Sequence, residues 1–367
     1  MNRRQLFGAA AALLATLGLA GCNEDKSTPD TKPQTEAAAP KTYTWKMVTA
    51  WPKNYPGLGT GAERIAERIT ALSGGRLTVK VYAAGELVPA LEVFDSVSRG
   101  TAEMGHGAAY YWRGKVPAAQ FFTSIPFGLS TQEMNAWLNK GGGQQLWEEA
   151  YAPFGVLPLA AGNSGMQMGG WFNKEINSLQ DLRGLKIRTP GLGGEVLTRL
   201  GATTVNLPGG EIFTALQTGA IDATDWVSPY NDLAFGLHKA ARYYYYPAWQ
   251  EPQAVIEMLV SKKAFEALPA DLQAIVREVA LASNQAMLDD YVYNNALALE
   301  ELKKQGVQLK RFPDPVLAAM KEQSEAVLGE LAAQNELNGR IWASLKAFQA
   351  QSTPMLELTE KELYNWR

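Results

Sequence analysis

A short apolar run that stops at an arginine places the strongest constraint on how this chain can fold. Leu185 and Ile187 alternate with Lys186, and Pro190 with the glycines after it prevents the strand from continuing. Arg188 is therefore predicted at the carboxyl end of a buried strand, which is the edge where open α/β sheets bind ligands. A guanidinium there can hold a carboxylate through two hydrogen bonds, although a surface position or a structural ion pair would also explain it.

The amino-terminal residues have the pattern of an export signal followed by a tether. Two arginines precede an apolar run over residues 6–19, which is shorter than the roughly 20 residues that cross a bilayer. The run ends in Leu-Ala-Gly-Cys, which resembles the lipobox of bacterial lipoproteins. Residues 1–22 are therefore predicted to be a lipoprotein signal peptide, with Cys22 as the lipid-anchored first residue of the mature chain. The paired arginines also resemble a twin-arginine signal, and both export routes stay open. Residues 23–41 lack large apolar side chains, which predicts a flexible tether.

Composition excludes several classes of protein. Residues 42–367 are long enough for two domains, and no stretch among them is apolar enough to span a membrane. Cys22 is the only cysteine in the chain, which excludes disulfides and cysteine-based metal sites from the folded part. The formal net charge is −3, so the chain has no basic excess of the kind that binds nucleic acid.

Strands alternate with helices along the rest of the chain. Alternating or apolar runs predict strands over residues 43–48, 76–82, 155–160, 167–172, 243–246, 254–260 and 307–312. Helical spacing predicts helices over residues 62–72, 89–100, 194–200, 210–217 and 270–305, a helix that begins with a capping box at Ser130, and a helical tail from residue 313 that ends before Pro354. The loop over residues 51–57 is unusually aromatic. This order of elements predicts an α/β fold.

A short internal repeat points to two similar lobes. Glu92-Val93-Phe94 and Glu211-Ile212-Phe213 begin two short helices, and each helix ends at a glycine and leads into a strand that bears an acid. Two lobes that face each other would produce this repeat, and so would chance. The predicted division assigns residues 42–165 and about 223–260 to the first lobe, 166–222 and about 261–312 to the second, and 313–367 to the tail. The long helix over residues 270–305 is predicted to run between the lobes.

Motifs for catalysis are scarce in this chain. The two histidines, His106 and His238, are far apart in the sequence, and each fits a structural or surface histidine better than a catalytic base. Residues 162–165 begin like a nucleophile elbow, but Met166 occupies the position of the second glycine. Val196 stands where a dinucleotide-binding loop needs glycine, so the glycines after Pro190 indicate a tight strand-to-helix turn.

The remaining candidates suit a binding site. They lie at strand ends or beside extended segments: Arg188, Asp225, Trp226, Gln167, Asn163, Gln250, Glu251, Tyr110 and Tyr111. Each could instead be a core aromatic residue or a solvated polar one. An anion on Arg188 would be repelled by Asp225 and Glu251 unless a cation lay between them. Oxygens from Gln167, Asp225 and the Trp226 carbonyl suit a hard cation, either Ca²⁺ or Na⁺.

Three motifs together resemble one family of receptors. They are Gln167 with Gly170-Trp171-Phe172, then Leu179-x-Asp181-Leu182-x-Gly184-Leu185-Lys186-x-Arg188, then Gly209-Gly210-Glu211-Ile212-Phe213-x-Ala215-Leu216-x-x-Gly219-x-Ile221-Asp222. This pattern is similar to that of the solute-binding subunits of TRAP transporters, over residues 51 to about 312. The resemblance implies a two-lobed periplasmic-binding-protein fold with a cleft between the lobes, a receptor that is not an enzyme, and a membrane permease as partner.

Within that family, the site residues resemble the branch that binds 2-oxo monocarboxylates such as pyruvate, or lactate, with a metal ion. This resemblance implies that Arg188 clamps the carboxylate and that Gln167, Asp225 and the Trp226 carbonyl hold the ion, with Glu251 beside them. Asn163, Tyr110, Tyr111 and Trp226 are then candidates for the substrate pocket. Related members often carry Glu in place of Asp225, so Na⁺ and Ca²⁺ both remain open.

The resemblance also implies a location and an assembly. We expect a periplasmic or surface receptor that is lipid-anchored through Cys22, with a possible homodimer through the C-terminal helix. Two alternatives remain. The ligand could be a dicarboxylate or a sugar acid, or the chain could be an exported enzyme in which Asp225 and Glu251 act as acid and base.

Overall fold

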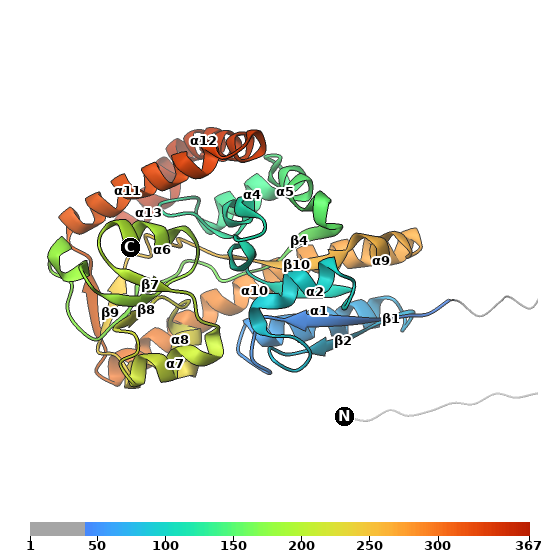
Figure 1. Ribbon diagram of the computed structural model, residues 1–367, viewed down its shortest axis with the longest axis horizontal. Helices are drawn as coiled ribbons and strands as arrows, with labels where there is room; N and C mark the ends of the chain where they lie inside the picture. Colours follow the sequence, from blue (N-terminus) through green and yellow to red (C-terminus); the bar gives the residue numbers. More distant parts are fainter. Residues whose placement is uncertain (1–40) are drawn as a thin grey trace, which may run out of the picture. The chain divides into compact units, whose positions relative to one another are not determined.

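The computed structural model describes residues 41–367, which contain two β-sheets and many helices (Figure 1). The predicted signal peptide, Cys22 and nearly all of the predicted tether lie outside the described residues. The α/β prediction is confirmed. None of the helices in the described part is long and apolar enough to cross a membrane.

The first sheet has five strands in the order β2-β1-β3-β10-β4. Their bounds are β1 Tyr43–Thr49, β2 Leu77–Tyr82, β3 Met104–Gly107, β4 Val156–Asn163 and β10 Val255–Ser261. The parallel pairing of β1 with β2 and β3 places their carboxyl ends at one edge, whereas β10 runs antiparallel to both of its neighbours. Six of the seven residues in β10 are buried because it lies between two other strands, as its apolar sequence predicted.

The second sheet has six strands in the order β11-β9-β5-β8-β6-β7. Their bounds are β5 Gly170–Phe172, β6 Lys186–Arg188, β7 Thr203–Val205, β8 Ala223–Thr224, β9 Tyr243–Tyr246 and β11 Gln308–Arg311. Strand β6 ends at Arg188 as predicted, and it runs parallel to β8, so that Arg188 pairs with Thr224. The residue after each of these two strand ends therefore lies at the same edge of the sheet.

Helices surround the two sheets. The α-helices are α1 Leu58–Leu72, α2 Val93–Ser98, α3 Gln120–Thr123, α4 Thr131–Asn139, α5 Gly143–Tyr151, α6 Gly191–Arg199, α7 Gly209–Gln217, α8 Pro229–Phe235, α9 Lys262–Glu266, α10 Ala270–Lys304, α11 Asp314–Ala333, α12 Glu336–Leu356 and α13 Glu362–Asn365. Short 3-10 helices add residues 90–92, 109–112, 117–119, 152–154, 179–182 and 237–239. The capping box that was predicted for α4 is present, since the Ser130 amide donates to Glu133 Oε2 at 2.8 Å.

The predicted lobe boundary after residue 222 differs from the observed sheets. Residues 223–260 were assigned to the first lobe, but β8 and β9 belong to the six-stranded sheet, and only β10 in that range belongs to the five-stranded sheet. Strand β8 has two residues and lies between β5 and β6. A segment this short has no periodicity that reveals its sheet, because long-range pairing alone decides where it lies.

Helix α10 and the C-terminal tail both reach the two sheet-containing parts. Helix α10 packs against β4 and α1 on one side of the molecule and against α8 on the other, as predicted for the long helix. In the tail, which forms one side of the view in Figure 1, α11 packs on α6 and α12 packs on α4 and α5. Two arginine–carboxylate pairs reinforce this bridge: Arg199 with Glu330, and Arg340 with Glu149.

Helical structure in the tail continues past Pro354, where it was predicted to stop. Pro354 lies inside α12, and a π-helical turn over Glu357–Lys361 connects α12 to α13. Proline has no N–H to donate to the carbonyl four residues earlier, and the π-helical turn that follows changes the hydrogen-bond spacing just after it. Val327, Leu331 and Ile341 of the tail are buried within this chain.

Candidate functional site

Arg188 is a buried residue with one side-chain nitrogen that has no hydrogen-bond partner. Its side chain is 1% exposed, its Nη1 donates to the Asp225 carbonyl at 2.8 Å, and its Nε donates to the Leu207 carbonyl at 3.1 Å. The Nη2 group is buried, and none of the described residues accepts a hydrogen bond from it. Buried polar groups are nearly always paired, so this nitrogen is a candidate contact for a ligand. Arg188 is not a surface residue, and no ion pair of Arg188 occurs within residues 41–367.

The turn after Arg188 brings the two lobes together. Gly191 begins α6 with φ of 61°, a conformation that favours glycine, and it packs against the ring of Tyr110 from the other lobe. Arg113 Nη1 donates to the Gly191 carbonyl at 2.9 Å. The strand-to-helix turn that was predicted from the glycines is therefore also a contact across the cleft.

Asp225 lies beside Arg188 at the same sheet edge. Its amide donates to the Arg188 carbonyl at 2.9 Å, and its carboxylate accepts from Gln250 Nε2 at 3.2 Å and from Thr189 Oγ1 at 3.4 Å. Burial raises the pKa of Asp225 to about 6, and the charge of Arg188 offsets part of that rise. A carboxylate that is buried with so few donors has oxygen lone pairs available for a ligand.

Glu251 is a second buried carboxyl beside Asp225. It is 4% exposed, and the Tyr110 hydroxyl donates to its Oε2 at 3.2 Å. Burial raises the pKa of Glu251 well above its usual range, and the nearby charge of Asp225 raises it further. The two acids therefore favour a bound cation or a shared proton over two free negative charges.

Gln167 and Asn163 differ in how they are paired, although both precede β5. Gln167 Nε2 donates to Ser164 Oγ at 2.9 Å, whereas its Oε1 is buried and accepts no hydrogen bond from any described residue. Asn163 Nδ2 donates to Gln253 Oε1 at 2.9 Å, and its Oδ1 accepts from the Gly165 amide at 2.9 Å. Gln167 therefore has an oxygen free for a ligand, and Asn163 shapes the segment that carries it.

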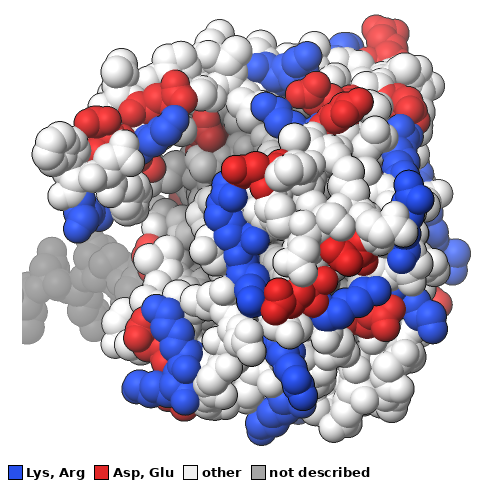
Figure 2. All heavy atoms as spheres, turned by 90° about the vertical axis from the view of Figure 1, so that its left-hand side faces the viewer, with Lys and Arg blue, Asp and Glu red and all other residues white. Residues whose placement is uncertain are grey.

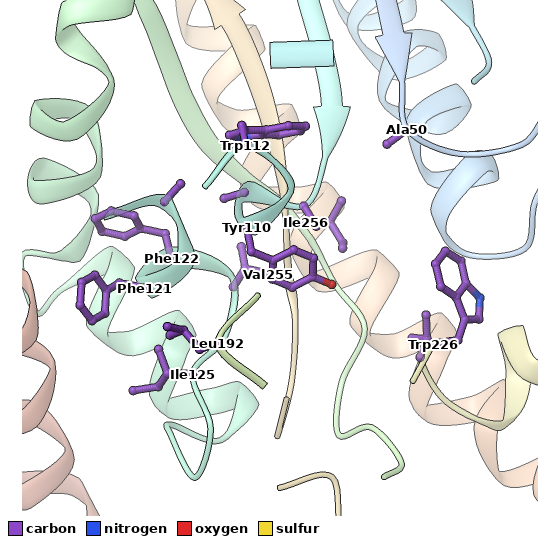
Figure 3. Close-up of a cluster of buried hydrophobic side chains, with 14 of the residues drawn as sticks. Ala50, Tyr110, Trp112, Phe121, Phe122, Ile125, Leu192, Trp226, Val255 and Ile256 are labelled. Atoms are coloured by element: carbon purple, nitrogen blue, oxygen red, sulfur yellow. The ribbon is translucent and has the colours of Figure 1, made fainter. Parts of the chain in front are cut away.

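A small cavity lies where these residues meet. It is lined by Trp51, Leu58, Tyr110, Tyr111, Ser164, Gln167, Trp226, Val227, Ala254 and Ile256. Figure 3 shows Tyr110 and Trp226 coming from different elements, with the Tyr110 hydroxyl directed toward the side on which Trp226 lies. The Arg188 guanidinium lies 5.1 Å from the Trp226 ring centroid. The positive charge of Arg188 also offsets part of the rise that burial causes in the pKa of Tyr111.

Most of the predicted residues thus converge, and some were missed. Tyr110, Tyr111, Gln167 and Trp226 line the cavity, and Arg188, Asp225 and Glu251 contact its walls. The cavity residues Trp51, Leu58 and Ile256 were not predicted, nor was Thr189 beside Asp225. The unusual aromatic content of the 51–57 loop was the available signal for Trp51, whereas Leu58 and Ile256 have no such signal.

The unpaired polar atoms define the chemistry of the site. Arg188 Nη2 is a donor for an anion, and the Oε1 atoms of Gln167 and Gln250 are buried acceptors without a described partner. No group of three His, Cys, Asp or Glu side chains within residues 41–367 could hold a metal ion. A cation here would rest on amide, carbonyl and carboxylate oxygens, the ligands of hard ions such as Na⁺ and Ca²⁺.

Neither histidine lines the cavity. His106 is fully buried, its Nδ1 accepts from Trp51 Nε1 at 2.8 Å, and burial lowers its pKa to about 3. His238 lies in the 3-10 helix Leu237–Lys239, where burial also lowers its pKa. On the face that Figure 2 shows, basic and acidic side chains are intermingled, so this face offers no broad basic surface to nucleic acid.

Comparison with known proteins assigns the family. A model of the family "bacterial extracellular solute-binding protein, family 7" matches residues 47–335. A monocarboxylate 2-oxoacid-binding periplasmic protein of Nostoc sp. strain PCC 7120 is 42% identical over 353 residues, which cover 96% of this chain and 94% of that protein.

Two solved structures agree with this match. The TRAP periplasmic solute-binding protein of Pseudoalteromonas atlantica T6c, solved with sodium and pyruvate, superposes with a TM-score of 0.86 at 39% identity, covering 89% of this chain and 99% of that one. The TRAP periplasmic solute-binding protein of Colwellia psychrerythraea, solved with calcium and pyruvate, superposes with a TM-score of 0.87 at 39% identity. The match covers 89% of this chain and 100% of that one. The chain therefore belongs to the bacterial extracellular solute-binding protein family 7, and it is a two-lobed, extracytoplasmic solute receptor of the TRAP transporter type.

Proposed function

We propose that this protein binds a small monocarboxylate, a 2-oxoacid such as pyruvate or else lactate, together with a Na⁺ or Ca²⁺ ion, and delivers it to a TRAP membrane permease. One observation carries the proposal. A buried donor on Arg188 and a buried acceptor on Gln167 both lack partners beside one small cavity. An anion and a cation that bind together would satisfy both, and neither alone would.

The proposed roles follow from the contacts. Arg188 receives the carboxylate through Nη2, the one of its three side-chain nitrogens that makes no hydrogen bond to a backbone carbonyl. Gln167 and Asp225 supply side-chain oxygens to the ion, Trp226 supplies its carbonyl, and Glu251 adds a nearby negative charge. The relatives solved with pyruvate contain sodium in one case and calcium in the other, which supports a hard ion at this position.

The remaining residues shape the pocket. Tyr110, Tyr111 and the Trp226 ring form its aromatic walls, and Asn163 holds the Gln167 segment through its own two hydrogen bonds. Ligand and ion contact groups from both lobes and therefore favour the closed state, which the permease then recognises.

A panel of ligands tests this function. Pyruvate, lactate, larger 2-oxoacids, succinate and a sugar acid are each added with Na⁺ or Ca²⁺, and the thermal midpoint is recorded, because a ligand of the folded form raises it. We expect the small monocarboxylates to raise the midpoint most, and only when an ion is present. A response to succinate or the sugar acid alone would transfer the proposal to that ligand class.

The proposed receptor releases its ligand unchanged. In the competing proposal of an exported enzyme, Asp225 and Glu251 would transfer protons, and the raised pKa of each gives that alternative its only specific support. Full recovery of pyruvate after prolonged incubation with the protein and the ion excludes an enzyme that converts pyruvate. Loss of more pyruvate than one molecule per protein supports the enzyme.

We also propose two features of location and assembly. The sequence around Cys22 supports a lipid anchor in the periplasm or at the cell surface, and intact mass spectrometry of the wild type and of Cys22→Ser tests it. The last helical segment exposes Met355, Leu358, Leu363, Tyr364 and Trp366, an apolar surface that supports a homodimer through the C-terminal helix. Light scattering of the full chain and of a variant truncated after residue 354 tests the dimer.

A further inference from the structure

The Trp226 side chain has surroundings that ligand binding alone does not explain. Its indole is 4% exposed, and its Nε1 donates to the Tyr55 hydroxyl at 2.7 Å. On the other side, the Arg188 guanidinium lies 5.1 Å from the ring centroid. The indole therefore lies between the proposed carboxylate clamp and a tyrosine that does not line the cavity.

Tyr55 belongs to the other lobe. It lies in the loop over residues 51–57 between β1 and α1 of the five-stranded sheet, whereas Trp226 follows β8 of the six-stranded sheet. The Tyr55 hydroxyl also donates to the Asn231 carbonyl at 3.0 Å, and Asn231 Nδ2 donates to the Pro56 carbonyl at 2.7 Å. Three hydrogen bonds thus connect this loop to the segment that begins at Trp226.

The indole has little freedom to turn away from Tyr55. The Phe235 ring stacks on Tyr55 with a centroid distance of 4.2 Å and on Trp226 at 5.3 Å. At the far end of the indole, a Cβ atom on Gly209 would lie 2.3 Å from Trp226. A shift of Tyr55 must therefore be transmitted to the indole and to the face that the indole presents to Arg188.

We infer that Tyr55 is a positioning residue: its hydroxyl holds the Trp226 indole against Arg188 and connects an occupied site to the first lobe. This inference rests on the proposed function, because it assumes that Arg188 receives the ligand carboxylate. It assigns a role to the aromatic 51–57 loop, which the sequence motifs left without one. Tyr55 touches neither ligand nor ion and acts through Trp226.

A matched pair of single-atom deletions tests the inference. Tyr55→Phe removes the hydroxyl that Trp226 donates to. Tyr291→Phe removes a second buried tyrosine hydroxyl, which donates to Asn231 Oδ1 but has no hydrogen bond to Trp226. We expect Tyr55→Phe to weaken pyruvate binding in the presence of Na⁺ or Ca²⁺ by about tenfold in calorimetry, the factor that corresponds to one buried hydrogen bond. Tyr291→Phe is expected to change it less than about twofold.

A double-mutant cycle separates positioning from general packing. In a Trp226→Phe background, which has no indole N–H, Tyr55→Phe is expected to have no further effect on pyruvate affinity, whereas Tyr291→Phe has the same effect as in the wild type. The inference would be overturned if Tyr55→Phe and Tyr291→Phe lowered pyruvate affinity equally. It would also be overturned if the effects of Tyr55→Phe and Trp226→Phe on that affinity were additive.

A readout that needs no ligand keeps the two proposals apart. The chain has 10 tryptophans, and the indole N–H signal that disappears in Trp226→Phe identifies Trp226 in a ¹⁵N spectrum. Tyr55→Phe is expected to shift that signal and Tyr291→Phe to leave it in place. If the wild type binds none of the tested acids, the proposed function is wrong, and the Trp226 signal alone then tests the role of Tyr55. A shift of that signal in Tyr55→Phe supports Tyr55 as the group that holds Trp226. An unchanged signal overturns that role.

Discussion

Arg188 and Asp225 are joined by two hydrogen bonds to backbone carbonyls, and within residues 41–367 no ion pair joins their side chains. Arg188 Nη1 donates to the Asp225 carbonyl at 2.8 Å, and the Asp225 amide donates to the Arg188 carbonyl at 2.9 Å. The Asp225 carboxylate instead faces Gln250 and Thr189. A guanidinium and a carboxylate are thus fixed side by side while each remains available to a ligand of opposite charge.

Arg188→Lys tests the planar clamp. Lysine keeps the positive charge but loses the fork of parallel N–H groups, so we expect pyruvate affinity to fall by about 10- to 100-fold. Arg199→Lys is the matched control, because Arg199 is an exposed arginine that pairs with Glu330 outside the cavity. Calorimetry measures both variants after circular dichroism has shown that they fold. Wild-type affinity in Arg188→Lys would contradict the assigned role.

Asp225→Asn tests the ion. An amide oxygen is a weaker ligand for a hard cation than a carboxylate, so we expect pyruvate binding to lose its dependence on Na⁺ or Ca²⁺ and to weaken, since acid and ion share oxygens. Asp232→Asn serves as the control, because Asp232 is equally buried but accepts hydrogen bonds from Trp171 and Tyr244. Ion titrations at fixed pyruvate distinguish the two variants. An unchanged ion dependence in Asp225→Asn would exclude that carboxylate as a ligand.

Asp232 is expected to make the stability of the protein depend on pH. Burial raises its pKa from 3.8 to about 7, so between these values the folded state binds more protons than the unfolded state. The free energy of unfolding therefore falls as the pH rises from about 4 to about 7, by about 1.4 kcal/mol for each unit of pKa difference. Urea denaturation of the wild type and of Asp232→Asn across this range measures the effect. Asparagine cannot titrate, so the free energy of unfolding of Asp232→Asn should change less steeply with pH than that of the wild type. Equal slopes in the two proteins would show that Asp232 is not the titrating group.

The sequence predicted the local parts of this structure well and the long-range parts poorly. The end of β6 at Arg188 and the capping box at Ser130 follow from neighbouring residues, and both were correct. The sheet that contains β8 depends on residues far away in the chain, and the predicted lobe boundary there was wrong. Strand pairing of this kind leaves no periodic signal in a two-residue segment.

The same limit applies to the site. Composition could not separate Gln167, which has a free oxygen, from Asn163, which has none, because their partners are set by folding. The contact between Tyr55 and Trp226 joins residues 171 positions apart. The 51–57 loop was noted as aromatic, but only the fold shows which side chain its tyrosine reaches.

Gly209 and Gly210 provide a prediction about the shape of the pocket. A Cβ atom on Gly209 would lie 2.3 Å from the Trp226 ring, whereas a Cβ atom on Gly210 meets no atom within 4 Å. Gly209→Ala should displace the indole, lower the free energy of unfolding by roughly 1–3 kcal/mol and weaken pyruvate binding. Gly210→Ala, in the same helix turn, should stabilise the protein by up to about 1 kcal/mol with unchanged affinity. Thermal unfolding and calorimetry of the pair provide the comparison, and equal behaviour of both variants would show that Trp226 is not confined there.

A crystal structure of the protein with pyruvate and Ca²⁺ tests the central claim most directly, because the anomalous signal of calcium locates the ion. We expect the pyruvate carboxylate within hydrogen-bond distance of Arg188 Nη2, and an ion between pyruvate, Gln167, Asp225 and the Trp226 carbonyl. Density for both at any other place, or pyruvate at Arg188 with calcium bound only at the surface, would contradict the proposal that acid and ion occupy one shared site.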